Sequence, residues 1–366
     1  MPTNLTKAIS FIVSIILAVS QFPAIANRYV KNSMENKAAQ TERLEAMKNG
    51  EISVVDEQSF ASFDLNDPTI KYNKVRTIMT HNSYKRAMDN DVYKLSIRFF
   101  DEEKFKGSLS EHDTLVAQLK NGVRALEIDV RYQINGFKVF HFPLVDASST
   151  SPDWKMTLEE LNLWSNANPG HVPITVLVEM KEDIIYLNPL YRKMDETKFK
   201  ALDKTIKDIM GDDKVVTASD IMGGYSTLAE VIKNDGWPKL SELRGKIIFL
   251  LHPDDKYTDM YINLDRTLKS QVFIPMIDYK DIDLYNDYAA FILHNQVDVD
   301  YIKDLVNKNY IVRTQMDSQQ VYDEKLKAQA LESGAQLLNT NLEKGIIFPK
   351  TGYEASLKDN YTIIDN

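Results

Sequence analysis

The sequence contains no cysteine in its 366 residues. A chain without cysteine has no disulfide, no thiol nucleophile and no thiolate ligand for a metal, and it lacks the cysteine that a lipoprotein export signal requires. Basic residues are also in deficit, with 44 Lys and Arg against 53 Asp and Glu, which gives a formal net charge of -9. This charge argues against nucleic acid as a partner and gives no general attraction to anionic membranes. Any contact with a phosphate or a lipid must therefore be local.

The turn after the first expected strand lacks the glycines with which a doubly wound α/β fold binds phosphate. The first strand-like run, KVRTIM at 74–79, is followed by THNSYK, which has no glycine. An open, doubly wound sheet normally has such a turn after its first strand. That architecture is therefore the weaker alternative for this chain.

The first 26 residues have the form of an export signal. Lys7 precedes the apolar run AISFIVSIILAV, and Ala24 and Ala26 follow at the spacing of a cleavage site. The apolar run is short for a membrane span, and an uncleaved anchor is the competing interpretation. We expect a signal peptide over 1–26 and an exported protein, secreted or periplasmic, that stays membrane-anchored if the signal is retained.

The remainder of the chain predicts one large domain. Residues 27–70 are polar and predict a leader helix or linker, whereas the following region alternates short apolar runs with helical stretches. Such alternation is typical of parallel βαβ units buried on both sides, and about eight units predict a single TIM-type α/β barrel over 71–350, with 351–366 as a tail. The expected strands are 74–79, 123–130, 137–141, 174–180, 246–252, 290–295, 310–314 and 335–340.

Acidic residues end two of these expected strands. Side-chain alternation in VRALEIDV puts Glu127 and Asp129 on one face, and Glu179 closes the run ITVLVEM. In a barrel, the carboxyl ends of the strands carry the chemistry. Together with Asn82, the three carboxylates form an all-oxygen donor set, which suits a hard divalent cation such as Ca²⁺. The competing interpretation is that Glu127 and Asp129 pair with lysines or arginines at the barrel mouth.

Two of the six histidines lie beside this acidic set. His81 ends the first expected strand and His141 ends FKVFH. Two imidazoles that flank a metal-bound phosphodiester can serve as general base and general acid, whereas the alternative is a pair of hydrogen-bonded core histidines. Lys181 and Arg313 are candidate phosphate-binding groups, and a structural ion pair is the alternative for Arg313.

These stretches resemble one family, the bacterial calcium-dependent phosphoinositide phospholipases C. The resemblance is carried, in family order over about residues 70–345, by THNSY, QLKNGVRALEIDVRY, FKVFHFP, TLEELNLWSNANPGHVPITVLVEMKED, GWPKLSELRGKIIFLL, VRTQMDS and the closing ALESGAQLLNTN. It implies a distorted TIM barrel that acts as a phosphoric diester hydrolase with one Ca²⁺ ion. The implied site residues are His81 and His141 for catalysis, Asn82, Glu127, Asp129 and Glu179 for the metal, and Lys181 and Arg313 for the substrate.

The implied reaction cleaves a glycerophospholipid at a membrane surface, with phosphatidylinositol as the usual substrate of the family. An inositol hydroxyl attacks phosphorus, a cyclic phosphate forms and diacylglycerol leaves. We expect His81 to take the proton and His141 to protonate the leaving oxygen, with a metal-activated hydroxyl and Glu127 as base as the alternative. The protein is expected to be a monomer and to bind no nucleic acid.

Two other functions compete with this one. A glycerophosphodiester phosphodiesterase uses the same kind of barrel, but that family usually opens with His-Arg where this chain has His81 and Asn82. An exported barrel that only binds a phosphorylated headgroup is the second alternative, although binding alone does not require two imidazoles.

Residues 85–112 resemble an enlarged loop beside the mouth of the barrel. The segment IRFF, 97–100, within this loop either packs as a helix or touches a membrane.

Overall fold

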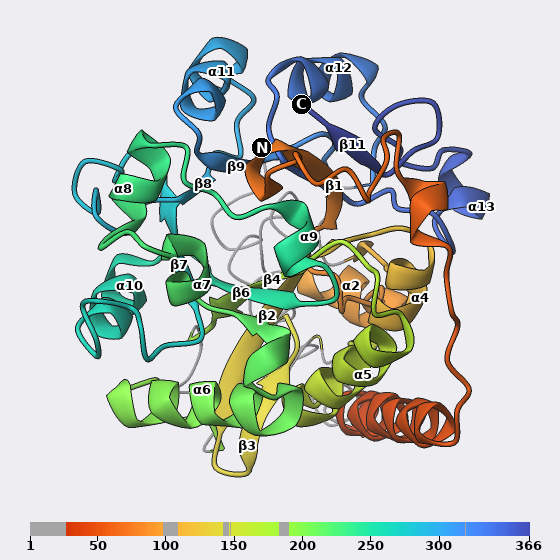
Figure 1. Cartoon of the computed structure of the whole chain (residues 1–366). Coiled ribbons are helices and arrows are strands. Elements are labelled where there is room, and N and C mark those ends of the chain that lie inside the picture. The colour runs from red at the N-terminus through yellow and green to blue at the C-terminus, as the bar shows by residue number, and fades with distance from the viewer. Residues whose placement is uncertain (1–26, 98–108, 142–145, 147, 183–189, 319) are drawn as a thin grey trace, which may run out of the picture.

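The computed structural model describes residues 27–97, 109–141, 146, 148–182, 190–318 and 320–366. At its centre parallel strands form a closed ring with helices outside it (Figure 1). The ring closes because β10 and β2 both pair in parallel with β1, which confirms the predicted TIM-type barrel. In order around the ring, its strands are β1 (Val75–Thr80), β2 (Ala125–Gln133), β4 (Ile174–Met180), β6 (Ile247–Leu251), β7 (Ile274–Asp278), β8 (Phe291–Leu293), β9 (Ile311–Gln315) and β10 (Leu337–Thr340).

The helices begin where the sequence supplies a capping side chain. The residues before most of them, such as Asp153, Asp195 and Asp298, accept a hydrogen bond from a backbone N–H of the first turn. Besides a helix over 27–48, the α-helices in the described part of the chain are α2 (Asn90–Ser96), α4 (Leu115–Lys120), α5 (Trp154–Ala167), α6 (Glu196–Met210), α7 (Ala218–Met222), α8 (Leu228–Lys233), α9 (Leu240–Leu243), α10 (Asp255–Ile262), α11 (Val299–Asn307), α12 (Glu324–Glu332) and α13 (Phe348–Thr351).

One expected barrel strand is wrong. The run 137–141 forms β3 (Gly136–Val139), which pairs antiparallel with β2 and lies outside the ring. The link between β2 and β3 is far too short for the crossover that a parallel strand requires, so the two strands form a hairpin.

One barrel strand was missed, namely β7. Its sequence IPMID contains Pro275, and a proline inside a short apolar run argues against a strand. In the structure Leu251 of β6 and Pro275 are register partners. The two errors compensate each other in the strand count, so the expected number of barrel strands came out right.

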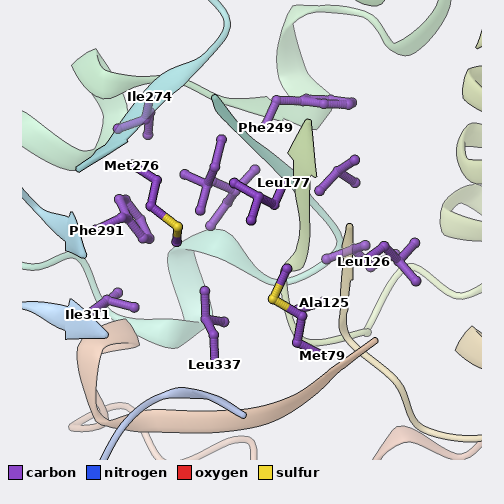
Figure 2. Packing of buried hydrophobic residues seen from close by; sticks show 14 of the residues in the cluster. Met79, Ala125, Leu126, Leu177, Phe249, Ile274, Met276, Phe291, Ile311 and Leu337 are labelled. Carbon is purple, nitrogen blue, oxygen red and sulfur yellow. The ribbon is translucent and has the colours of Figure 1, made fainter. Parts of the chain in front are cut away.

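The interior of the barrel is filled by apolar side chains. Met79, Leu177, Met276 and Leu337 come from four different strands and point toward one another (Figure 2). Each is 3% exposed or less, and burial of one such side chain contributes about 1.5–3 kcal/mol to folding. This packed layer supports the polar residues that lie at the carboxyl ends of the strands.

The segments outside 71–350 also pack on the barrel. A helix over 27–48 contacts α5, where Arg43 Nε donates to Glu160 Oε1 at 2.9 Å (Figure 1). The short strand β11 (Ile363–Asp365) adds antiparallel to β1. The boundaries at 70 and 350 stay a prediction.

Within the part of the chain that the structure describes, no helix has the length and apolar character needed to cross a bilayer. The expected export signal over 1–26 lies outside the described residues, as does most of the IRFF segment.

Candidate active site

A tight turn after β1 carries the first two site residues, His81 and Asn82. Asn82 has a φ of 48°, in the left-handed region that asparagine tolerates better than most residues. The backbone N–H of Lys85 donates to the carbonyl of Asn82 at 2.7 Å and closes the turn. His81 and Asn82 therefore lie at the carboxyl end of the barrel.

Ser83 connects this turn to β2 through hydrogen bonds, and the sequence analysis did not predict this role. The Ser83 N–H donates to the Glu127 carbonyl, and the Glu127 N–H donates back to Ser83 Oγ, both at 2.8 Å. Gln118 Nε2 donates to the Ser83 carbonyl at 2.7 Å. The positions of His81 and Glu127 are thus coupled through the backbone.

His81 and Glu127 face each other across the seam between β1 and β2. His81 Nε2 lies 3.7 Å from Glu127 Oε1, and Arg313 Nη2 donates to Glu127 Oε2 at 2.6 Å. Burial opposes the charge on Glu127, but the cations beside it, chiefly Arg313, lower the pKa of this carboxyl below its ordinary value. Arg313 therefore forms the ion pair that was the alternative interpretation, and its contact with a substrate phosphate stays a prediction.

Asp129 and Glu179 lie side by side because they are register partners on β2 and β4. Lys181 Nζ hydrogen-bonds Glu179 Oε1 and lies 3.8 Å from Asp129 Oδ2. Among the described residues, neither carboxylate oxygen of Asp129 has a hydrogen-bond partner, although the side chain is fully buried. Burial and the negative charge of Glu179 raise the pKa of Asp129 well above its ordinary value.

His141 reaches this group from the β2–β3 hairpin rather than from a barrel strand. Its carbonyl accepts a hydrogen bond from Arg131 Nη2 at 2.7 Å, which ties the end of the hairpin to β2. Burial, together with the charges of Lys85, Lys181 and other neighbouring groups, lowers the pKa of His141 to about 3. Its imidazole is therefore neutral at pH 7 in this state.

Asn341 is a further site residue that the sequence analysis missed. His81 Nδ1 lies 3.3 Å from Asn341 Oδ1, and Asn82 Nδ2 lies 3.2 Å from His81 Nε2. An amide oxygen only accepts and an amide nitrogen only donates, so Nδ1 carries the proton and the unprotonated Nε2 accepts from Asn82. Asn341 is itself held by Asp317, which accepts from its backbone N–H at 2.8 Å.

The oxygen donors of the predicted ligands are of the type that binds calcium, but the structure does not arrange them around a common ion position. Among the described residues, no group of three or more His, Asp or Glu side chains is arranged to hold a metal ion. The oxygens of Asp129, however, are buried and lack hydrogen bonds in the described part of the chain, which is costly unless a cation satisfies them. The assignment of Asn82, Glu127, Asp129 and Glu179 as ligands stays a prediction.

The other histidines have structural partners. His112 Nδ1 lies 2.9 Å from Glu343 Oε2, His171 Nε2 lies 2.8 Å from Ser165 Oγ, and the His294 ring stacks on Tyr279 with 3.8 Å between centroids. His252 Nδ1 lies 3.1 Å from the Pro253 carbonyl oxygen, and this histidine also helps to lower the pKa of Glu127.

Solved structures of bacterial phosphoinositide-specific phospholipases C share this fold. A calcium-dependent enzyme from Pseudomonas sp. superposes with a TM-score of 0.59 at 18% identity, over 85% of this chain and 100% of that one. A Ca²⁺-dependent enzyme from Streptomyces antibioticus gives 0.52 at 16% identity, over 81% of this chain and 99% of that one. At such identities the likeness establishes the barrel alone. No curated protein matches the sequence.

The family is shown by the sequence itself. The family described as "Phosphoinositide phospholipase C, Ca2+-dependent" matches residues 70–136 and 131–366. The chain therefore belongs to this family, and the resemblance noted in its sequence is confirmed. As a member it is a phosphoric diester hydrolase, a calcium-dependent phosphoinositide phospholipase C.

Proposed function

We propose that this enzyme cleaves the bond between phosphate and diacylglycerol by attack of the neighbouring inositol hydroxyl, which forms a cyclic inositol phosphate that water then opens. The observation that supports the proposal is the state of His81. Its Nδ1–H donates to Asn341, which leaves Nε2 unprotonated, and Nε2 accepts from Asn82 and faces Glu127. A fixed, unprotonated imidazole nitrogen is what a general base requires.

His141 is the proposed general acid. Burial keeps it neutral in the free enzyme, so it needs a reason to take up a proton. A phosphodiester anion beside the ring favours the imidazolium and raises its pKa toward neutrality. Substrate binding therefore prepares the group that protonates the leaving glycerol oxygen.

Asn82, Glu127, Asp129 and Glu179 are the proposed ligands of one calcium ion. When bound, the ion supplies a Lewis acid that offsets negative charge on the phosphoryl oxygens. The reciprocal hydrogen bonds with Ser83 keep Glu127 in line with the His81–Asn82 turn, so the base and the ligands keep their spacing. Lys181 and Arg313 are the proposed contacts with the substrate phosphate.

A rim of exposed apolar side chains supports action at a membrane surface. Val321 and Tyr322 follow β9, Ile346 and Phe348 follow β10, and their exposed fractions are 63%, 43%, 38% and 48%. The two segments lie together because Gln320 donates to the Glu111 carbonyl and Lys350 pairs with the Glu111 carboxylate. They lie at the end of the barrel that carries the site, where an exposed apolar patch favours contact with lipid.

The proposal also includes export of the enzyme from the cytoplasm. The charged and apolar pattern of residues 1–26 supports a signal that delivers the enzyme to the cell exterior or periplasm, where it acts as a monomer on lipid.

Phosphorus NMR of the products from phosphatidylinositol tests the reaction directly. We expect a cyclic phosphate signal with calcium, no turnover in excess chelator, and recovery when calcium is restored. His81→Ala and His141→Ala are each expected to lower kcat by about 10²–10⁴-fold. Turnover that persists in both variants would disprove the acid–base assignment. Faster cleavage of a soluble glycerophosphodiester than of phosphatidylinositol would instead identify a glycerophosphodiester phosphodiesterase.

A further inference from the structure

The side chain of Lys181 lies between two of the proposed calcium ligands. Its ammonium hydrogen-bonds Glu179 and lies 3.8 Å from Asp129 Oδ2. Asp129 is fully buried, and its oxygens accept no hydrogen bond from the described residues, so the charge of Lys181 is what offsets its own. The ammonium therefore offsets the charge of two carboxylates that belong to the proposed calcium ligands.

The ammonium can leave this position without any movement of the barrel. The backbone N–H of Lys181 donates to the Val130 carbonyl at 3.0 Å, which fixes the main chain where β4 ends. The side chain is 24% exposed, so part of it borders solvent. A lysine stem has four rotatable carbons and its ammonium has no fixed direction of bonding.

Arg313 differs from Lys181 in each of these respects. Its side chain is 2% exposed, and its guanidinium is bonded to Glu127 at 2.6 Å and to Asn295 on the other side. A planar group held at two edges has little freedom to leave. Arg313 is thus a permanent counter-ion of Glu127.

We propose that Lys181 is an exchangeable counter-ion, displaced when calcium binds and then available to the substrate phosphate. The proposal rests on the proposed function. Metal ligation requires ionised carboxylates, and the three together carry three negative charges. A divalent ion and Arg313 balance those charges, so Lys181 becomes the surplus cation when the ion binds. The freed ammonium then meets the phosphodiester anion at the mouth. One side chain therefore opposes metal binding and supports substrate binding.

Calcium titration by calorimetry, in the absence of lipid, tests the competition. Lys181→Met keeps the stem but removes the competitor, and we expect it to bind Ca²⁺ about tenfold more tightly, or about 1.4 kcal/mol. Lys181→Arg retains the charge and is expected not to tighten binding. The matched control is Lys256→Met, since Lys256 pairs with Glu182 at the surface and, in the described part of the chain, forms no ion pair with Asp129 or Glu179.

Two further measurements separate this role from simple structural support. In chelator, Lys181→Met is expected to melt at a lower temperature than the wild type, because Asp129 and Glu179 lose their counter-ion, and saturating calcium is expected to abolish the difference. At saturating calcium, its KM for phosphatidylinositol is expected to rise about tenfold, from the loss of one phosphate contact. Tighter metal binding combined with weaker substrate binding is the distinguishing result.

Unchanged or weaker Ca²⁺ binding in Lys181→Met would overturn the exchange while leaving the phospholipase assignment intact, provided that the wild type binds the ion. A wild-type chain that binds no Ca²⁺ would overturn both.

Discussion

At the scale of single residues, the orientation of His81 depends on Asn341. Asn341 Oδ1 accepts from Nδ1 of the ring and is placed by Asp317, at the ends of β10 and β9. Asn341→Leu removes the acceptor while keeping the volume, so both tautomers become populated. We expect kcat to fall about 10–100-fold with little change in KM, by analogy with the loss of other groups that orient a reactive histidine.

Nitrogen-15 NMR of the His81 ring reports which ring nitrogen carries the proton. A purely structural role of Asn341 would leave this tautomer unchanged. The wild type should show a protonated Nδ1, and Asn341→Leu should show a mixture. Asn162→Leu on α5, where Asn162 Nδ2 donates to a backbone carbonyl, is the control. A single unchanged tautomer in Asn341→Leu would refute the positioning role.

His171 predicts how stability depends on pH. Burial lowers its pKa from 6.5 to about 4, and its Nδ1 lies 2.7 Å from the Val172 carbonyl oxygen while its Nε2 lies 2.8 Å from Ser165 Oγ. The contribution of neutral His171 to the free energy of unfolding is complete above pH 6.5. It is lost as the pH falls toward 4, and the total loss is about 3 kcal/mol at most. Urea denaturation at pH 7.5 and 4.5 should therefore show a smaller loss in His171→Gln than in the wild type. Equal losses in the two proteins would contradict this.

At the scale of elements, Gly122 shows how closely the outer segments pack on the barrel. It lies between α4 and β2 with a φ of 91°, and a Cβ at this position would lie 2.4 Å from Thr362 Oγ1 and 2.7 Å from the Phe60 ring. Gly122→Ala should lower the free energy of unfolding by roughly 2 kcal/mol or more, because the strained backbone and the overlap both add to the cost.

The control for this substitution is Gly136→Ala. Gly136 has a φ of 107°, but no atom lies within 4 Å of its added Cβ, so only the backbone strain remains. We expect the smaller loss there, measured by urea denaturation, and equal losses would show that close packing at Gly122 is unimportant.

The sequence predicts elements through periodicity and predicts the site through position along strands. Glu127, Asp129 and Glu179 were identified because the carboxyl ends of parallel strands meet at one end of a barrel. Periodicity cannot show that β3 folds back as a hairpin, or that β7 continues through Pro275. Asn341 gave no signal because its partner, His81, is 260 positions away in the chain. The contact of Lys181 with two acids depends on a side-chain conformation, which no sequence pattern encodes.

At the scale of the whole molecule, the apolar rim and the acidic net charge predict how the enzyme reaches lipid. Since the chain carries a net charge of -9, we expect vesicle binding to depend on apolar contact and to change little with salt. The combined variant Val321→Ser, Ile346→Ser and Phe348→Ser should lose most binding to phosphatidylcholine vesicles in a sedimentation assay.

Val54→Ser is the matched control, because Val54 is 75% exposed but precedes the barrel strands rather than following β9 or β10. The rim would be dismissed as a lipid contact if the combined variant sedimented with vesicles as the wild type does.

The position of β1 has a consequence for biosynthesis. Its neighbours in the sheet are β2, β10 and β11, and the last two lie between Leu337 and Asp365, far along the chain from β1. A nascent chain emerging from the ribosome therefore carries its His81 turn on a strand with one flank unpaired until β10 has been synthesised. Hydrolytic competence should consequently arise only after β10 has left the ribosome, and a message truncated before codon 337 should yield an inactive product.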